Sequence, residues 1–264
     1  MPQPIIDMHQ HPPTAEGLDA RVEACRRAGI EKAVLLGLPE RRRPGCNADA
    51  LAASQAYPEL FIPYFAPETE TMTPDDLMRA RDAGYVGLKF IGPRRPYNDP
   101  GYFPIYERAA ELRMPALFHL GIVANSPGWQ DVDSNCMRPI YLDHIARQLP
   151  TLRIIGAHLG NPWSDEAAMC CRWNMNLFFD LSGSLLKYRK PSYLGDLLWW
   201  KATGHYAAKD KRDAWEKIVF GSDVDSPEIG DMVNDYTKLM DALELAPELR
   251  EAIWHKTAER ILGL

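Results

Sequence analysis

The sequence predicts an α/β protein of the (β/α)8 class, a TIM barrel with one extra helix at its C-terminus. Short apolar segments with strand character alternate with longer amphipathic segments, and eight such pairs follow one another. The chain has 264 residues, close to the about 250 that eight strand–helix units require. No linker or low-complexity segment interrupts the alternation, so residues 1–264 are expected to form a single domain.

The first four pairs occupy the N-terminal part of the chain. Runs of β-branched and aliphatic residues bounded by turn residues indicate buried strands, and apolar residues three or four positions apart indicate helices. These signals place strands at residues 5–9, 32–38, 60–66 and 86–92, and helices at residues 17–29, 47–59, 74–84 and 101–113.

The second half of the chain repeats the alternation. Strands are expected at residues 115–121, 153–160, 177–183 and 217–223, each followed by one of the helices at 139–150, 164–176, 192–202 and 228–243. One more helix, residues 247–264, has no strand before it. It is the extra C-terminal helix of the prediction.

A doubly wound open sheet would produce a similar alternation and is the competing architecture. Its dinucleotide-binding form carries GxGxxG after the first strand, and nucleotide-binding P-loops carry GxxxxGK[ST]. Neither motif occurs at these places in the sequence. The barrel is therefore favoured.

The composition and charge of the chain exclude several classes of function. The chain is 46% hydrophobic and 25% charged, which is typical of a globular protein, and its formal net charge is −6. That charge argues against nucleic acid and acidic membrane surfaces as partners.

No apolar run approaches the roughly 20 residues of a membrane helix, and the N-terminus resembles no signal peptide, so we expect a cytoplasmic protein. The five cysteines lack metal-ligand spacing and are expected to be reduced thiols.

Four of the seven histidines, His9, His11, His119 and His158, stand at the carboxyl ends of predicted strands. In a (β/α)8 barrel these ends and the following loops build the active site. A single strand histidine is more often a hydrogen-bonded core residue. Four at one rim indicate a metal site.

His9 and His11 are two residues apart, so the strand periodicity points both into the barrel mouth. His119 ends the fifth strand and Asp223 ends the eighth. Three neutral imidazoles and one carboxylate suit one divalent transition metal with an open position for water. We expect zinc, with manganese or iron(II) as alternatives.

The residues leave two further roles open. His158 would ligate a second metal or, with a single metal, move protons as a general acid or base beside a metal-bound water, together with Asp223. Lys89 ends the fourth strand, where a buried ammonium needs an anion. It would hold a substrate carboxylate, pair with an acid at the rim, or be carboxylated to bridge two metals.

The residues also carry a family resemblance over nearly the whole chain. The segments IIDMHQHP, VGLKF, MPALFHLG, LPTLRIIGAHLGNPW, LFFDLSG, FGSDVDSP and TAERILGL resemble, in order and in barrel position, the amidohydrolase-2 branch of the amidohydrolase superfamily. That branch contains aminocarboxymuconate-semialdehyde decarboxylase, γ-resorcylate decarboxylase and pyrone dicarboxylate lactonase. The resemblance implies that His9, His11, His119 and Asp223 are metal ligands and that His158 is catalytic.

Two departures from the family pattern concern the substrate. Val224-Asp225-Ser226 precedes Pro227 where the family commonly has an aromatic residue followed by proline. His255-Lys256 replaces the usual Gly-Asn of the last helix. The missing aromatic–proline pair favours hydrolysis over decarboxylation.

Basic residues gather in loops that a barrel places on its active-site face. They are Arg41, Arg42, Arg43, Arg94, Arg95, Lys187, Arg189 and Lys190. A guanidinium binds a carboxylate with two hydrogen bonds, so these loops predict a small carboxylated substrate, with Arg42, Arg94, Arg95 and Lys89 as its binding residues. Solvated loop charges are the alternative. Trp129, in the long loop after the fifth strand, is expected to cover a planar ring.

Three functions follow from these features. The first is a metal-dependent hydrolase that attacks a lactone, ester or amide of a small anionic substrate with a metal-activated water. The second is a metal-dependent decarboxylase of an aromatic or muconate-type acid, and the third is a barrel that binds without catalysis. The expected ligand set serves hydrolase and decarboxylase alike. A homodimer stays open as the assembly state.

Overall fold

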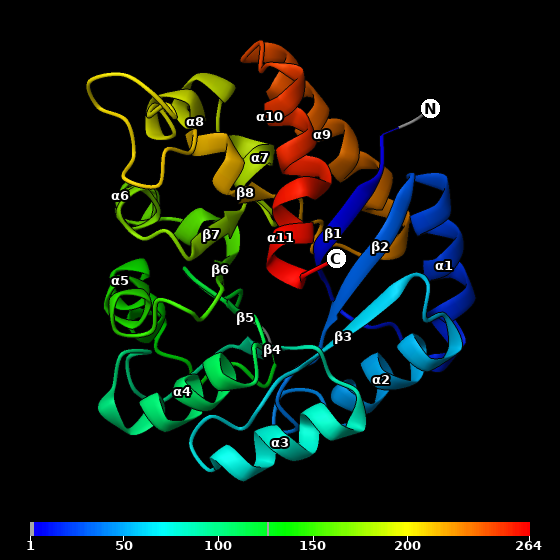
Figure 1. Ribbon diagram of the computed structural model, residues 1–264. Helices are drawn as coiled ribbons and strands as arrows, with labels where there is room; N and C mark the ends of the chain where they lie inside the picture. The colour runs from blue at the N-terminus through cyan, green and yellow to red at the C-terminus, as the bar shows by residue number, and fades with distance from the viewer. Residues whose placement is uncertain (1–2, 126) are drawn as a thin grey trace.

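A computed structural model describes residues 3–125 and 127–264 and contains one sheet of eight parallel strands (Figure 1). Each strand pairs with its sequence neighbours, in the order β1 to β8, without the reversal that defines an open doubly wound sheet. The predicted (β/α)8 barrel is confirmed. The strands are β1 Ile5–Gln10, β2 Ile30–Leu36, β3 Phe61–Phe65, β4 Gly87–Phe90, β5 Ala116–Phe118, β6 Ile154–Gly156, β7 Leu177–Asp180 and β8 Ile218–Val219.

The barrel closes between its first and last strands just beyond the short β8. The backbone N–H of Met8 donates to the carbonyl of Phe220 at 2.9 Å, and the N–H of Asp223 donates to the carbonyl of His9 at 2.7 Å. Gly221 allows this approach, because a Cβ atom there would lie only 2.9 Å from the Cβ of His9. Closure therefore brings Asp223 beside His9.

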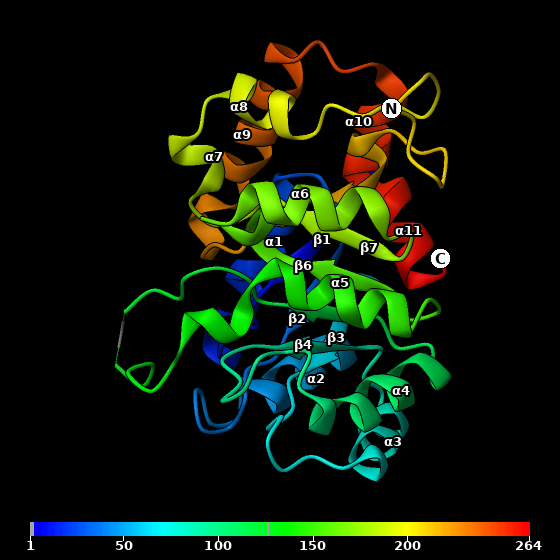
Figure 2. The ribbon, with the colours of Figure 1, turned by 90° about the vertical axis from the view of Figure 1, so that its left-hand side faces the viewer.

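Helices surround the strands on the outside (Figures 1 and 2). Their apolar faces pack against the outward-facing strand residues in one large core. No helix in residues 3–125 and 127–264 is long and apolar enough to cross a membrane. The helices are α1 Leu18–Arg27, α2 Cys46–Ala56, α3 Pro74–Ala83, α4 Phe103–Glu111, α5 Pro139–Gln148, α6 Ser164–Trp173, α7 Leu185–Tyr188, α8 Pro191–Leu197 and α9 Ile229–Ala242.

The chain ends in the expected extra helix, built from α10 Pro247–Glu251, a π-helical segment Ala252–Lys256 and α11 Thr257–Leu262. Ala258 and Ile261 of α11 pack with barrel-interior residues such as Ile6 and Val34. α11 thus covers one end of the barrel (Figure 1). The other end, at the carboxyl ends of the strands, is where (β/α)8 barrels carry their active sites.

The largest difference from the predicted elements follows β7. The expected helix over 192–202 stops at Leu197, and the short helix α7, which the sequence pattern did not predict, precedes it. Trp200 turns into the core instead of continuing the helix and is 1% exposed. Downstream, the buried Lys217 donates to the Asn174 carbonyl at 2.6 Å and pairs with Asp210 at 3.2 Å. These contacts fix the loop that leads into β8.

Candidate active site

The first strand directs its histidines through an irregularity in the sheet. Ile6 and Met8 pack inside the barrel, so strict alternation would turn His9 outward. The pairing register of β1 with β2 shifts between Asp7 and Gln10. Irregular pairing of this kind re-aims side chains next to active sites. It lets His9 follow Met8 and still face the interior, so the expected inward direction of His9 depends on this irregularity and not on the strand period.

Asp7, which is fully buried, fixes this irregular segment. Its carboxylate accepts the backbone N–H groups of His9 and Ser222, both at 3.0 Å, and the Gln10 amide at 2.8 Å. Burial raises the pKa of Asp7 against these hydrogen bonds. Asp7 therefore ties the end of β1 to the segment that carries Asp223.

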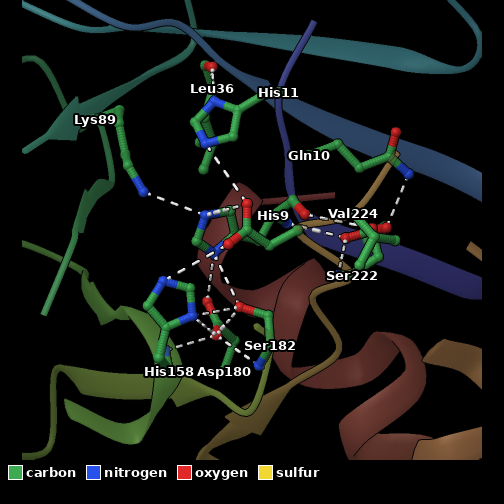
Figure 3. A network of polar contacts seen from close by, with 12 residues as sticks. His9, Gln10, His11, Leu36, Lys89, His158, Asp180, Ser182, Ser222 and Val224 are labelled. Atoms are coloured by element: carbon green, nitrogen blue, oxygen red, sulfur yellow. Dashed lines mark hydrogen bonds and ion pairs between the residues drawn. The ribbon is translucent and has the colours of Figure 1, made fainter. Parts of the chain in front are cut away.

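His9, His11 and Asp223 converge at the carboxyl edge of the barrel. Figure 3 shows the two histidines. The Oδ1 atom of Asp223 lies 3.5 Å from Nε2 of His9 and 3.6 Å from Nε2 of His11. Nδ1 of His11 lies 2.8 Å from the Leu36 carbonyl, to which it must donate, so its Nε2 carries the free lone pair. These three residues offer ligand atoms within 4.8 Å of one another and could hold a metal ion.

The electrostatics of the cluster favour the forms that metals bind. Burial lowers the pKa of His11 to about 3 and that of His119 well below its usual value, so both imidazoles are neutral. Burial opposes ionisation of Asp223, but the nearby His9, His158, His11 and Lys89 side chains outweigh it and lower the pKa of Asp223. Neutral imidazoles beside a carboxylate are a suitable donor set for a divalent transition metal.

His119 and His158 face the cluster from β5 and β6. The His119 ring centroid lies 4.9 Å from that of His158, and the His158 ring lies 5.1 Å from that of His9. Nε2 of His119 is buried and has no hydrogen-bond partner among the described residues. A buried imidazole nitrogen without a partner is costly. A metal ion would satisfy it, although His119 lies outside the 4.8 Å group of His9, His11 and Asp223.

His158 has an unusual backbone. Its φ of 58° and the φ of 42° at Leu159 lie in the left-handed region, and Asp223 has a φ of 49°. Such strain gathers at functional sites. Nε2 of His158 lies 3.7 Å from Oδ2 of Asp223, and burial lowers the pKa of His158. His158 is thus a neutral imidazole that faces the second oxygen of Asp223.

Asp180 and Ser182, which the sequence analysis did not single out, connect two of these histidines (Figure 3). The carboxylate of Asp180 lies 2.9 Å from Nδ1 of His9 and 2.5 Å from the hydroxyl of Ser182. That hydroxyl lies 2.9 Å from Nδ1 of His158. His9, His158 and the Ser182 hydroxyl hold the pKa of Asp180 well below its usual value against the opposing effect of burial.

The ionised Asp180 fixes the tautomers of both histidines. A carboxylate only accepts, so Nδ1 of His9 and the Ser182 hydroxyl must donate to it. The Ser182 oxygen is then the acceptor for Nδ1–H of His158. Both imidazoles are left with the lone pair on Nε2, the nitrogen that faces Asp223. This arrangement matches the carboxylate partners that orient metal-binding histidines.

Asp180→Asn is expected to weaken metal affinity or activity about 10- to 100-fold, because its NH2 group would face either Nδ1–H of His9 or the three donors on the other oxygen, which are the Ser182 hydroxyl and the N–H groups of His158 and Ser182. Asp196→Asn, on the exposed surface of α8, is the matched control. Competition with a chelator measures the metal affinity of both variants. Equal affinities in the two variants and the wild type would remove the orienting role of Asp180.

Lys89 reaches the same cluster from β4. It is fully buried, and its ammonium nitrogen lies 3.2 Å from Nε2 of His9. Burial lowers the pKa of Lys89 to about 8, while Asp223 and Asp180 oppose that effect. Lys89 thus contributes a titratable amine to the cluster.

Two cavities open onto the cluster. One, of about 670 Å³, is lined by His11, Asp223, Arg21, Arg43 and Lys187, among others. The other, of about 290 Å³, lies against His119, His158 and Asp223. Asp223 borders both, so its side chain is accessible from either cavity.

A comparison of the sequence with models of protein families identifies the family of this chain. The family model described as amidohydrolase matches residues 6–264. The chain belongs to the amidohydrolase family. No curated protein sequence matches this amidohydrolase.

Solved structures resemble this amidohydrolase in fold. An uncharacterised TIM-barrel protein from Bordetella bronchiseptica is 20% identical over 98% of each chain, with a TM-score of 0.73. A probable 2-pyrone-4,6-dicarboxylic acid hydrolase from Acinetobacter baumannii is 16% identical over 98% of this chain and 99% of that chain, with a TM-score of 0.63. A 5-carboxyvanillate decarboxylase from Novosphingobium aromaticivorans, with bound manganese, is 14% identical over 100% of this chain and 98% of that chain, with a TM-score of 0.69.

Arg42 and Trp129 do not line the two cavities at the histidine cluster. The Arg42 side chain is 3% exposed, bonds to Asp131 and the Gly128 carbonyl, and stacks 4.7 Å from the Trp129 ring centre. Trp129 lines a separate cavity of about 380 Å³. Arg42 therefore links the loops after β2 and β5 through its Nη1 atom, and its buried Nε and Nη2 atoms have no hydrogen-bond partner among the described residues.

Arg94 and Arg95 also point elsewhere. Arg95 pairs with Asp99 at 2.6 Å and stacks over Tyr102 at 4.5 Å, and Arg94 is exposed. Neither is among the described residues that line the two cavities at the cluster. The basic residues that do line the larger cavity are Arg21, Arg43 and Lys187.

A sequence signal for Asp180 did exist. Asp180 ends β7 in LFFDLSG, so the strand-end rule that identified Asp223 applies to it equally. Ser182 and Asp7 gave no comparable signal. Their importance comes from contacts with residues 24 and 215 positions away.

Proposed function

We propose that this amidohydrolase is a metal-dependent hydrolase that cleaves a lactone, ester or amide bond in a small carboxylated molecule. The placement of Asp223 carries the proposal. One of its oxygens lies 3.5 Å from Nε2 of His9 in the candidate metal cluster, and the other lies 3.7 Å from Nε2 of His158. A carboxylate in this position can pass a proton between a water molecule at the cluster and a leaving group beside His158.

The residues that would hold the metal are His9, His11, His119 and Asp223. The unpartnered, buried Nε2 of His119 and the close ligand atoms of the other three support this assignment. Three imidazoles and a carboxylate suit zinc, and also manganese or iron(II). A bound metal would supply Lewis acidity, which polarises a carbonyl group and lowers the pKa of water.

The chain's own groups then move the protons. Asp223 is ionised and can accept a proton from the water that attacks the substrate carbonyl. His158 is neutral with its lone pair on Nε2, so it can take that proton from Asp223 and release it to the leaving oxygen or nitrogen. Water adds across the bond, and both groups return to their starting forms.

Decarboxylation is the second candidate, because the same pair of residues could deliver a proton to a substrate carbon as carbon dioxide leaves. Relatives in fold include the manganese-containing 5-carboxyvanillate decarboxylase and a 2,6-dihydroxybenzoate decarboxylase. Lactones, esters and amides of small acids, and aromatic and muconate-type acids, form the panel that separates the two. Hydrolysis in ¹⁸O-labelled water puts the label into the product, whereas decarboxylation in D₂O puts deuterium on carbon. A metal-loaded protein inactive on the whole panel would favour a binding barrel.

The substrate carboxylate is proposed to bind at the basic residues of the larger cavity. The Arg43 guanidinium bonds to the Pro12 carbonyl at 2.8 Å and to Asp49 at 3.0 Å, and it keeps further N–H donors for a ligand in the cavity. Arg43→Gln should lower kcat/KM for an anionic substrate about 10- to 100-fold, because hydrogen bonds to charged groups are worth about 1.5–3 kcal/mol. Arg95 lies outside the cavity, so Arg95→Gln should leave kcat/KM for the anionic substrate unchanged. If Arg43→Gln lowered kcat/KM equally for a neutral analogue, the proposed binding of a substrate carboxylate by Arg43 would be wrong.

A further inference from the structure

One outer face of the barrel gathers exposed aromatic and apolar side chains. Trp173 is 52% exposed, Trp199 is 45% exposed and Tyr206 is 65% exposed. Met169 and Met175 are 47% and 54% exposed. These five residues, here called the α6 patch, belong to α6, the residues just after it and the loop after α8. Figure 2 shows α6 on the outer surface, at the front of the view.

Contacts with Arg172 and between Trp199 and Tyr206 join the three aromatic residues of the α6 patch. The guanidinium of Arg172 lies 4.5 Å from the ring centre of Trp173 and 5.1 Å from that of Trp199. Arg172 also donates to the Tyr206 carbonyl at 2.8 Å. The rings therefore form a pre-ordered surface, which lowers the entropy lost when a partner binds.

The charges around the α6 patch are arranged along the helix. Asp165, Met169 and Trp173 are all exposed and four residues apart, so they lie on one side of α6 over about 12 Å. The acid stands at the N-terminal end of this stripe. At the other end lies the loop 199–213, where four basic side chains, Lys201, Lys209, Lys211 and Arg212, face only two acidic ones. Arg212 donates to the Met175 carbonyl at 3.4 Å, which places this loop beside the end of α6.

We propose that the α6 patch is the interface for a second copy of this chain, with the two α6 helices antiparallel about a twofold axis near Met169. A twofold axis places the same surface on both sides, so the surface must complement itself. The α6 stripe does so. Antiparallel packing brings the acidic end of each helix to the aromatic and basic end of the other, and Met169 meets its own copy.

The exposed area is of the size that an interface needs. An aromatic side chain buries about 150–250 Å² when covered completely. The exposed fractions of the three rings therefore offer about 250–400 Å², up to half of the roughly 800 Å² that each partner contributes to a standard interface. The two methionines and the charged rim supply more. Tryptophan, tyrosine and arginine are also the residues that dominate binding energy in interfaces.

Sedimentation velocity of the metal-loaded protein tests the proposal. We expect a dimer for the wild type at micromolar concentration and a monomer for Met169→Glu, which places two carboxylates at the axis. Met78→Glu is the matched control, since Met78 lies on α3 and is 43% exposed, and this variant should stay dimeric. Asp165→Lys should weaken the dimer at least tenfold, because it turns an attraction at each end into a repulsion.

Cross-linking locates the axis independently. Met169→Cys should form a disulfide-linked dimer on mild oxidation, and the wild type should not, because its five cysteines are buried. Met78→Cys should remain monomeric on a non-reducing gel. A monomeric wild type, or a dimer that Met169→Glu leaves intact and Met169→Cys does not cross-link, would overturn the proposal. Binding of a monomer to anionic vesicles through this surface would also overturn it.

Discussion

Replacing His9 and His11 with alanine is expected to abolish metal retention. Gently purified wild-type protein should hold about one transition-metal ion per chain, because the proposed site consists of three imidazoles and one carboxylate, a ligand set for a single ion. His9 and His11 supply two of the three groups whose ligand atoms lie within 4.8 Å of one another. Without them Asp223 and His119 cannot retain the ion. Elemental analysis after dialysis measures the content.

Folding and site effects are separable in this experiment. Loss of His9 leaves the buried Asp180 without one of its donors, so the double variant will also be less stable. His11→Ala alone removes one hydrogen bond, to the Leu36 carbonyl, and should lose most of the metal while keeping its fold. His144→Ala, on the exposed side of α5, should retain the full content. A wild type without metal, or an unchanged content in the double variant, would contradict the assignment.

His158→Asn is expected to lower turnover by about two to four orders of magnitude while the metal content stays near that of the wild type. A general acid or base typically contributes that range. Asparagine suits the test because, like histidine, it tolerates a positive φ, here 58°. An alanine at this position would combine backbone strain with the chemical change. Steady-state kinetics and elemental analysis on the same preparation give the two readings.

The paired measurement separates the two roles that the sequence leaves open for His158. Loss of activity with retained metal assigns proton transfer. Parallel loss of metal and activity would make His158 a ligand and would favour a binuclear centre, with Lys89 as the bridging residue. Unchanged turnover would exclude His158 from the reaction.

Much of the fold was predictable because it depends on local patterns. Each strand is a short apolar run, and each of the four strand-end histidines lies at or near the rim where β1, β5 and β6 finish. The loop after α8 was harder, because its course depends on the burial of Trp200 and on the Lys217 contacts, which join distant segments. The basic loops were harder still. The basic residues of these loops can be read from the sequence. Their ion pairs, Arg42 with Asp131 and Arg95 with Asp99, depend on how the chain packs.

The order of the strand–helix units and the set of polar residues at the strand ends could be predicted from the chain alone. These follow from periodicity, and parallel strands of a barrel deliver their carboxyl ends to one rim whatever the details of packing. The arrangement of the side chains at that rim depends on contacts between distant parts of the chain. The shifted register that turns His9 inward, the buried Asp7 that holds it, and the link from Asp180 through Ser182 to His158 all join residues far apart in the chain. Hydrogen bonds depend on ångström-scale distances, and the packed barrel alone fixes these.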